Sequence, residues 1–181
     1  GIDAKIWIVG GAIRDFFCNK QVSDIDFVTS MDINLFAKKI VKTNIKIFKK
    51  NIQYKTITLI LGNNEYQITS FRKDLITFGR QAYVSSAESL YQDSLRRDFT
   101  VNALYLNEEG DLIDPLGGLK DIKKKELKFI GDPIKRIEED YLRAIRFCRF
   151  FAIFPNKNIS NDLKNKIMSK LYNISILSNK R

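Results

Sequence analysis

The sequence predicts a mixed α/β domain followed by an all-helical segment. Short apolar runs of strand length alternate with helical patterns as far as about residue 125. From Pro133 onward the strand patterns end and helical spacing takes over. The 181 residues, of which 44% are hydrophobic, suffice for one folded domain and the beginning of a second. We therefore expect an α/β domain at 1–125 and a helical segment at 126–181.

The first predicted elements are a strand, a glycine turn, a helix and a second strand. Residues 5–9 form a short apolar run that ends at the Gly10-Gly11 pair, which is typical of a strand followed by a tight turn. Apolar residues at helical spacing predict a helix over 12–19, and the run at 25–29 predicts the next strand. This order places the glycine turn directly before a helix.

A helix and a hairpin are expected next. Helical spacing covers about 32–43, and two runs with alternating apolar residues, at 56–61 and 66–71, predict strands. The sequence Gly62-Asn63-Asn64 between these runs is typical of a hairpin turn. The two strands are therefore expected to pair.

The remaining elements become helical toward the end of the chain. We interpret 74–86 as a loop and predict two short strands at 101–106 and 112–113. Helical spacing then predicts helices at about 137–154 and 160–172.

The net charge favours a polyanionic partner. Lys and Arg number 31 and Asp and Glu number 21, so the chain carries +10 at neutral pH. A compositional excess of lysine is the alternative explanation, because the chain is also rich in Ile and Asn. The segment 155–181, however, holds six basic residues and one acidic residue. This basic end is the part that we expect to contact nucleic-acid phosphates.

Composition also excludes several classes of chemistry. The chain has no histidine, which rules out Ser-His-Asp and Cys-His nucleophiles, histidine general bases and the usual His-containing zinc sites. Cys18 and Cys148 lie inside apolar helical patterns without CxxC spacing, so we expect buried free thiols in a reducing compartment. No run of about 18 uncharged apolar residues predicts a membrane span.

Two short motifs carry the clearest chemistry. Gly10 and Gly11 open a predicted helix, where backbone amides and the positive end of the helix dipole favour a phosphate. Asp24 and Asp26 stand two residues apart on a predicted strand and so share one face. Left alone the two carboxylates would repel each other, whereas one or two Mg²⁺ ions would keep both ionised. The alternative is a pair of solvated residues on an exposed strand face.

These motifs belong to a longer series. The pattern Gly10-Gly11-x-x-Arg14-Asp15 followed by Asp24-x-Asp26 resembles the nucleotidyltransferase superfamily that includes DNA polymerase β. LRRDFTVNA at 95–103, DPLGG at 114–118 and EDYLRAIRF at 139–147 are similar to blocks of its class II branch, the tRNA nucleotidyltransferases and bacterial poly(A) polymerases. The resemblance implies a nucleotidyltransferase head with a mixed β-sheet and flanking helices, followed by the start of an all-helical neck.

The resemblance also implies roles for single residues. Asp24 and Asp26 would be the catalytic pair that holds the two Mg²⁺ ions of a two-metal site, which activate an RNA 3′-hydroxyl and stabilise the departing pyrophosphate. Asp98 and Asn102, four residues apart, could share a helix face near the ribose or the arginines. The nucleotide-binding set of the head would be Gly11, Arg14, Arg97, Asp98 and Asn102. The alternative for Arg96 and Arg97 is that both are ordinary surface charges.

Four charged residues recur every three positions in the predicted helix at 137–154. They are Asp140, Arg143, Arg146 and Arg149, and they would form a slanted row along one side. A solvated helix with ordinary charge pairs is the alternative. The row resembles the family's protein template for CTP and ATP, because A and C both present an amino donor beside a ring-nitrogen acceptor. Asp140 and Arg143 would pair with the base, and Arg146 and Arg149 would lie toward the phosphates.

Two features depart from the family pattern. Gln67 stands where the family commonly carries a glutamate, so either a third acidic group is dispensable or the alignment slips by one residue. The last residues, 174–181, resemble the start of a neck motif that the chain then abandons, and the family's body and tail domains are absent from this sequence. A first residue other than Met is typical of a fragment or a trimmed chain.

The expected function is template-independent, metal-dependent addition of C and/or A residues to the 3′ end of tRNA from CTP and ATP, in a CCA-adding or a partial CC- or A-adding enzyme. Poly(A) polymerase is one alternative, which the segment 74–86 and the absent domains would decide. A catalytically weakened RNA-binding module is another, motivated by Gln67. The expected partners are the tRNA 3′ end and the two nucleotides, without a membrane, in the cytoplasm or in an organellar matrix after removal of a targeting segment. The oligomeric state is left open.

Overall fold

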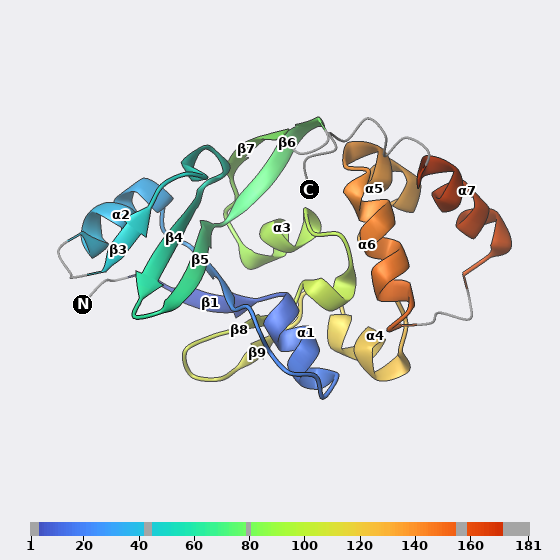
Figure 1. Ribbon diagram of the computed structural model, residues 1–181, viewed down its shortest axis with the longest axis horizontal. Helices are drawn as coiled ribbons and strands as arrows, with labels where there is room; N and C mark the ends of the chain where they lie inside the picture. The colour runs from blue at the N-terminus through green and yellow to red at the C-terminus, as the bar shows by residue number, and fades with distance from the viewer. Residues whose placement is uncertain (1–3, 42–44, 79–80, 155–158, 172–181) are drawn as a thin grey trace.

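A mixed β-sheet and a group of helices make up opposite ends of the computed structural model (Figure 1). The structure describes residues 4–41, 45–78, 81–154 and 159–171. Strands and helices alternate in the first two thirds of the chain, and only helices follow. The predicted α/β class with a mixed sheet and flanking helices is therefore confirmed.

The main sheet has seven strands in the order β3-β4-β5-β2-β1-β8-β9. Neighbours are antiparallel except for β2 and β5, which run parallel. Gly62 joins β4 to β5 with φ 61°, a left-handed conformation that glycine adopts without strain, so the predicted hairpin is confirmed. The strands are β1 Ile6–Val9, β2 Asp26–Thr29, β3 Lys46–Phe48, β4 Thr56–Leu61, β5 Asn64–Ser70, β8 Tyr105–Leu106 and β9 Leu112–Ile113.

Seven α-helices and two short 3₁₀ turns are present in the described part of the chain. Asp32 begins the second helix, because its carboxylate accepts hydrogen bonds from the backbone N–H of Asn34 at 3.0 Å and of Leu35 at 3.2 Å. The predicted helices at 12–19, 32–43 and 160–172 are confirmed; the first two end earlier than predicted, at Phe17 and Ile40, and residues 42–43 and 172 lie outside the described residues. The elements are α1 Gly11–Phe17, α2 Ile33–Ile40, α3 Leu90–Leu95, α4 Gly118–Lys124, α5 Pro133–Glu139, α6 Leu142–Phe151 and α7 Asn161–Leu171, with η1 Ile52–Tyr54 and η2 Thr100–Asn102.

The predicted single helix at 137–154 is wrong. Two helices, α5 and α6, meet at Asp140, whose backbone is extended with φ −153° and ψ 106°. The Asp140 carboxylate accepts a hydrogen bond from the backbone N–H of Leu142 at 3.0 Å. Because an aspartate that bonds to a nearby backbone N–H favours a helix start, the chain begins a new helix here.

The predicted strand at 101–106 is wrong in its first half, where η2 replaces it. The Thr100 hydroxyl donates a hydrogen bond to the buried Asp121 carboxylate of α4 at 2.6 Å. A Cβ at Gly118 would overlap the Thr100 carbonyl, so the glycine lets α4 approach the turn closely. These contacts with α4 hold residues 100–102 out of the sheet.

The segment predicted as a loop at 74–86 is mostly strand. β6 Arg72–Phe78 and β7 Gln81–Ser86 form a separate two-stranded antiparallel sheet. The register shifts between Asp74 and Ile76. Such a bulge interrupts the period-two pattern by which a strand is recognised in sequence.

The largest hydrophobic core joins the two predicted segments. It contains Ile13, Phe99 and Leu104 from the first 125 residues, and Ile137 and Phe147 from the helices that follow. Helices α5, α6 and α7 therefore pack against the α/β part instead of standing apart from it (Figure 1). The division at 125 stays a prediction, and this core crosses it.

The expectation of two buried thiols is wrong for one of them. Cys18 is half-buried at the end of α1, and burial raises the pKa of its thiol. Cys148 is exposed, because Ala144 and Phe147 occupy the face of α6 that packs into the core. Both cysteines are free. No helix in the described ranges is long and apolar enough to cross a membrane.

Candidate active site

A cleft of about 660 Å³ opens where the start of α1, the α3–η2 connection and α6 meet. Every residue that the sequence analysis assigned to the site lines this cleft. The wall includes Asp24 and Asp26, then Gly11, Arg14, Arg97, Asp98 and Asn102, and finally Asp140, Arg143, Arg146 and Arg149. Segments that lie more than one hundred residues apart in the sequence are thus brought to one place.

The glycine turn forms one edge of the cleft. Gly10 has φ 77°, in the region that favours glycine, and its backbone N–H donates to the Leu104 carbonyl at 3.0 Å. A Cβ at Gly10 would lie 3.4 Å from the Asn102 carbonyl oxygen and 3.5 Å from Arg97 Nη1. The absence of a side chain at Gly10 therefore lets η2 and the arginine approach the turn.

Only one of the two predicted aspartates lies on a strand. Asp26 is the first residue of β2, and Asp24 precedes the strand in an exposed segment. Desolvation raises the pKa of Asp26, Arg97 lowers it, and Asp24 raises it further. Within the described ranges neither carboxylate forms an ion pair, unlike Asp15, Asp93 and Asp98. The two acidic groups are thus close enough to repel, and Arg97 offsets this repulsion at Asp26 without forming an ion pair with it.

This pair fits a magnesium ion. Mg²⁺ prefers hard oxygen ligands and is often bound by one or two carboxylates together with substrate phosphates. No cluster of three or more His, Cys, Asp or Glu ligands occurs in the described part of the chain, so any metal would depend on the two aspartates and on other oxygens. Mutual repulsion of Asp24 and Asp26 is the feature that a divalent cation would relieve.

Gln67 lies beside the aspartate pair. It is the Cα partner of Asp26 in the parallel β2–β5 ladder, and both residues are exposed. A slip of one residue would turn the side chain to the other face of the sheet. Gln67 is therefore the residue of β5 that lies on the same side of the sheet as Asp26, and its neighbours Tyr66 and Ile68 face the other side.

Arg14 and Asn102 connect α1 with η2. Arg14 donates to both carboxylate oxygens of Asp15, at 2.9 and 2.8 Å, and to Asn102 Oδ1 at 2.6 Å. Asn102 in turn donates from Nδ2 to Asp98 Oδ1 at 2.9 Å. Asp98 and Asn102 therefore meet as predicted, but through a 3₁₀ turn and not along an α-helix.

Asp98 links this chain of contacts to α6. Its carboxylate accepts from Arg146 Nε at 2.5 Å and from the backbone N–H of Phe99 at 2.9 Å. Burial alone would raise the pKa of Asp98, but Arg146, Asn102 and Phe99 outweigh it and hold the pKa below its ordinary value. Asp98 is therefore an ionised group that orients Arg146 toward the cleft.

The charged row occupies the far wall of the cleft. Arg143 is buried, with 8% of its surface exposed, and donates to Glu139 at 2.5 Å and to the Arg136 carbonyl at 2.8 Å. The alternative of a solvated helix face is therefore wrong for Arg143. Asp140 shares the wall with the arginines, although it lies before α6 and not on it.

Sequence reasoning missed the aromatic base of the cleft. The Phe150 ring is 2% exposed and packs under three guanidinium groups, with the Arg14 and Arg149 carbons each 4.6 Å and the Arg146 carbon 5.5 Å from its centroid. Phe150 follows Arg146 by four residues, a spacing that could have identified it. Asp93 and Tyr105 were also missed and contact Arg97.

Comparisons with known proteins find relatives over most of the chain. The family model described as the Poly A polymerase head domain matches residues 6–128. The chain is 34% identical over 159 residues to the mitochondrial CCA tRNA nucleotidyltransferase 1 of Homo sapiens, with 87% of this chain and 37% of that protein covered. It is 38% identical over 150 residues to the CCA-adding enzyme of Streptococcus uberis, with 82% and 36% covered. The chain thus spans little more than a third of the length of these relatives.

Solved structures agree in fold. The CCA-adding enzyme of Bacillus stearothermophilus in complex with CTP superposes with a TM-score of 0.78 at 27% identity, and covers 97% of this chain and 42% of that one. A tRNA nucleotidyltransferase complexed with a primer tRNA and an incoming ATP analog gives a TM-score of 0.70 at 28% identity, with 93% and 47% covered.

Proposed function

The chain belongs to the class II tRNA nucleotidyltransferase and poly(A) polymerase family, and from this premise we propose that it adds C and/or A residues to the 3′ end of tRNA from CTP and ATP without a nucleic-acid template. One observation carries the proposal. A single cleft brings together the carboxylates of Asp24 and Asp26, which form no ion pair with any described residue, several arginines, and Asp140 beside Arg143. These are the groups that metal binding, triphosphate binding and base selection each require.

The residues of the cleft divide the chemistry between them. Mg²⁺ ions held by Asp24 and Asp26 would activate the attacking RNA 3′-hydroxyl and stabilise the departing pyrophosphate. Arg14 and Arg97, beside the glycine turn, present guanidinium groups to the triphosphate oxygens. Arg146 and Arg149 add positive charge from α6 over the same space.

Base selection falls to Asp140 and Arg143. A carboxylate that accepts from an exocyclic amino group and a guanidinium that donates to a ring nitrogen fit both C and A. With G or U the donor and acceptor order is reversed, which leaves buried polar groups unpaired. Arg143 is already fixed by Glu139 and by the Arg136 carbonyl, so its position is set before a nucleotide enters.

The ligands bound in solved relatives support the proposed substrates. Solved relatives hold CTP in one case and a primer tRNA with an ATP analog in another. Because this chain spans little more than a third of its curated relatives, the activity of the whole protein is part of the proposal. Relatives include bacterial and mitochondrial proteins, which supports the proposal of a cytoplasmic or organellar-matrix location.

A catalytically weakened RNA-binding module is the second candidate. The observation that favours it is Gln67, an amide beside Asp26 where the family pattern has a carboxylate. A module of this kind would bind nucleotide and RNA without joining them.

Incorporation of CMP and AMP into tRNA that lacks its 3′ end separates the candidates. The proposal predicts addition of C, A or both, and a halt after the CCA sequence or a part of it. Continued addition of A alone would identify a poly(A) polymerase. Binding of CTP without any incorporation would identify the weakened module.

A further inference from the structure

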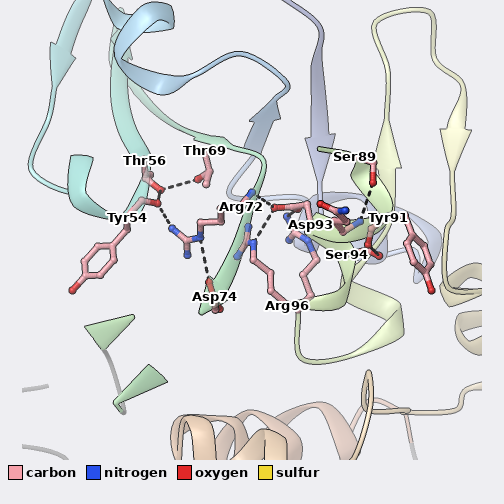
Figure 2. Close-up of polar contacts among 12 residues, drawn as sticks. Tyr54, Thr56, Thr69, Arg72, Asp74, Ser89, Tyr91, Asp93, Ser94 and Arg96 are labelled. Carbon is pink, nitrogen blue, oxygen red and sulfur yellow. Dashed lines mark hydrogen bonds and ion pairs between the residues drawn. The ribbon is translucent and has the colours of Figure 1, made fainter. Parts of the chain in front are cut away.

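Asp93 is a buried carboxylate just outside the wall of the cleft. It lies on α3 and is fully shielded from solvent, with 0% of its surface exposed. Its Oδ1 accepts from Arg96 Nε at 2.9 Å and from the backbone N–H of Arg72 at 3.4 Å. In Figure 2, dashed lines join Asp93 to Arg72 and to Arg96. Asp93 therefore lies at the junction of α3 with the first residue of β6.

The other oxygen of Asp93 is directed at Arg97. Asp93 Oδ2 accepts from Arg97 Nη2 and from the Tyr105 hydroxyl, each at 3.0 Å. Arg97 Nε donates to the same Tyr105 hydroxyl at 3.1 Å, and its guanidinium lies over the Tyr105 ring at 5.3 Å from the centroid. Two nitrogens of Arg97 are thus hydrogen-bonded, and the Tyr105 ring covers one face of its guanidinium group.

These contacts leave one nitrogen of Arg97 directed at the cleft. Arg97 Nη1 lies 3.5 Å from the place where a Cβ at Gly10 would stand, which is the edge formed by the glycine turn. Arg97 also lines the cleft itself. Arg97 Nη1 is therefore the nitrogen that is placed to meet a ligand at the glycine turn.

Two adjacent arginines with little exposed surface need a counter-charge. The side chains of Arg96 and Arg97 are 14% and 15% exposed, and both pair with Asp93. Without a carboxylate between them, desolvation and mutual repulsion would drive both toward solvent.

We propose that Asp93, together with the Tyr105 hydroxyl, is a positioning residue that holds Arg97 in the orientation in which it binds the nucleotide triphosphate. The inference rests on the proposed function, because it assigns the phosphate as the partner of Arg97. Asp93 itself contacts no substrate and acts through the arginine.

Binding measurements on Asp93→Asn and Tyr105→Phe test this role. The probes are CTP with Mg²⁺, inorganic tripolyphosphate and cytidine, titrated against the protein without RNA. We expect Asp93→Asn to lower the affinity for CTP and for tripolyphosphate about 10-fold or more, the magnitude expected for loss of a charge-assisted hydrogen bond. Cytidine affinity should stay within about twofold. Tyr105→Phe keeps the ring under Arg97 and should give a smaller loss of the same kind.

Asp121→Asn is the matched control. Asp121 is also buried and paired, with Lys128 and Thr100, and it contacts neither Arg96 nor Arg97. This variant should lose stability but keep the affinity for CTP. In Arg97→Ala, adding Asp93→Asn should cause little further loss of CTP affinity, because both changes act through one guanidinium.

Two outcomes would overturn the inference. One is an equal loss of affinity for CTP and for cytidine in Asp93→Asn and Tyr105→Phe, which would indicate general unfolding of the cleft. The other is unchanged CTP affinity in both variants while Arg97→Ala weakens it. Failure of the wild-type protein to bind CTP at all would instead contradict the proposed function.

Discussion

The two carboxylates of the cleft differ in how firmly the fold holds them. Asp26 begins β2 and is paired in register with Val9 on one side and Gln67 on the other, whereas Asp24 precedes the strand. The pKa of Asp26 is raised, so its ionised form is disfavoured while no cation is bound. The stability that such a group contributes is present below its ordinary pKa and is lost as the pH rises through the folded value.

Asp26→Asn should therefore abolish nucleotide transfer without lowering stability. At pH 7 the substitution removes a disfavoured charge and its repulsion with Asp24, so the free energy of unfolding should stay within about 0.5 kcal/mol of wild type or rise. Asp24→Ala should lose transfer in the same way. Thermal melts and a CMP-incorporation assay check both results. Transfer near the wild-type rate in Mg²⁺ by either variant would contradict the assigned metal site.

For Asp93 we expect the opposite dependence of folding stability on pH. Burial raises its pKa, but Arg96 and Arg97 outweigh this and lower it from 3.8 to about 2. The ionised group therefore stabilises the fold above its ordinary pKa, and this contribution disappears as the pH falls from about 4 to about 2. The shift corresponds to about 2 kcal/mol. Wild type should lose this amount over that window in denaturant titrations, and Asp93→Asn should not.

The residues that line the cleft could be predicted from the sequence motifs, but the buried residues that hold them in place could not. All eleven residues assigned from the motifs line the cleft. They could be recognised in the sequence because they are glycine, Asn102 and charged residues at distinctive spacings. Asp93, Tyr105 and Phe150 act by contacting those residues from the buried side. A buried Tyr in a sequence is indistinguishable from ordinary core, so only the fold identifies Tyr105 as a partner of Arg97. The four-residue spacing from Arg146 is the one signal that could have identified Phe150.

Among the elements, the junction of α5 and α6 decides what the charged row can do. The break at Asp140 turns its side chain to the backbone N–H of Leu142 through one oxygen, while Arg143 and Arg146 follow on α6. Asp140 thus has a second task as the residue that begins the helix. The sequence pattern predicted one continuous helix, because spacing of apolar residues carries no information about a single extended residue between two helices.

Asp140→Ala should relax base selection more than it weakens triphosphate binding. An unpaired buried group costs about 1–3 kcal/mol when the wrong base enters, and this penalty against UTP and GTP is lost with the carboxylate. Stability should fall by about 1 kcal/mol from the lost helix start. Kinetics with CTP, ATP, UTP and GTP measure the effect. Equal losses for all four nucleotides would show that Asp140 serves the helix alone.

Arg146→Ala offers the contrasting result on the same helix. Arg146 pairs with Asp98 and lies over Phe150. Contacts with phosphate do not distinguish one base from another, so the binding of all four nucleotides should weaken to the same extent. A selective loss for one base in this variant would contradict the division of roles along α6.

At the level of the whole molecule, the net charge is +10, but some of the basic residues are already paired with carboxylates. Of the six basic residues at 155–181, Lys157, Lys180 and Arg181 lie outside the described residues. Lys166 pairs with Asp162 at 2.7 Å and Lys170 with Glu138 at 2.6 Å. Exposed pairs of this kind are weak, so both lysines can exchange a carboxylate for a phosphate.

The affinity for tRNA should accordingly depend steeply on salt. Each phosphate contact contributes about 0.7–0.9 log units of affinity per log unit of salt concentration. Replacing Lys164, Lys166 and Lys170 with Gln should reduce the slope by up to three contacts. Filter binding at several salt concentrations measures it. A flat dependence in the wild-type protein would indicate that the lysine excess is compositional.

The most direct test of nucleotide transfer follows the α-phosphate. tRNA lacking its 3′ end is mixed with α-³²P-labelled CTP, Mg²⁺ and wild-type protein or Asp26→Asn, without any template strand. The wild-type protein should transfer the label to the RNA with release of one pyrophosphate for each residue added, and Asp26→Asn should bind CTP without transferring it. CTP binding by the wild-type protein with no labelled RNA, in the presence of Mg²⁺ and a competent acceptor, would contradict the account.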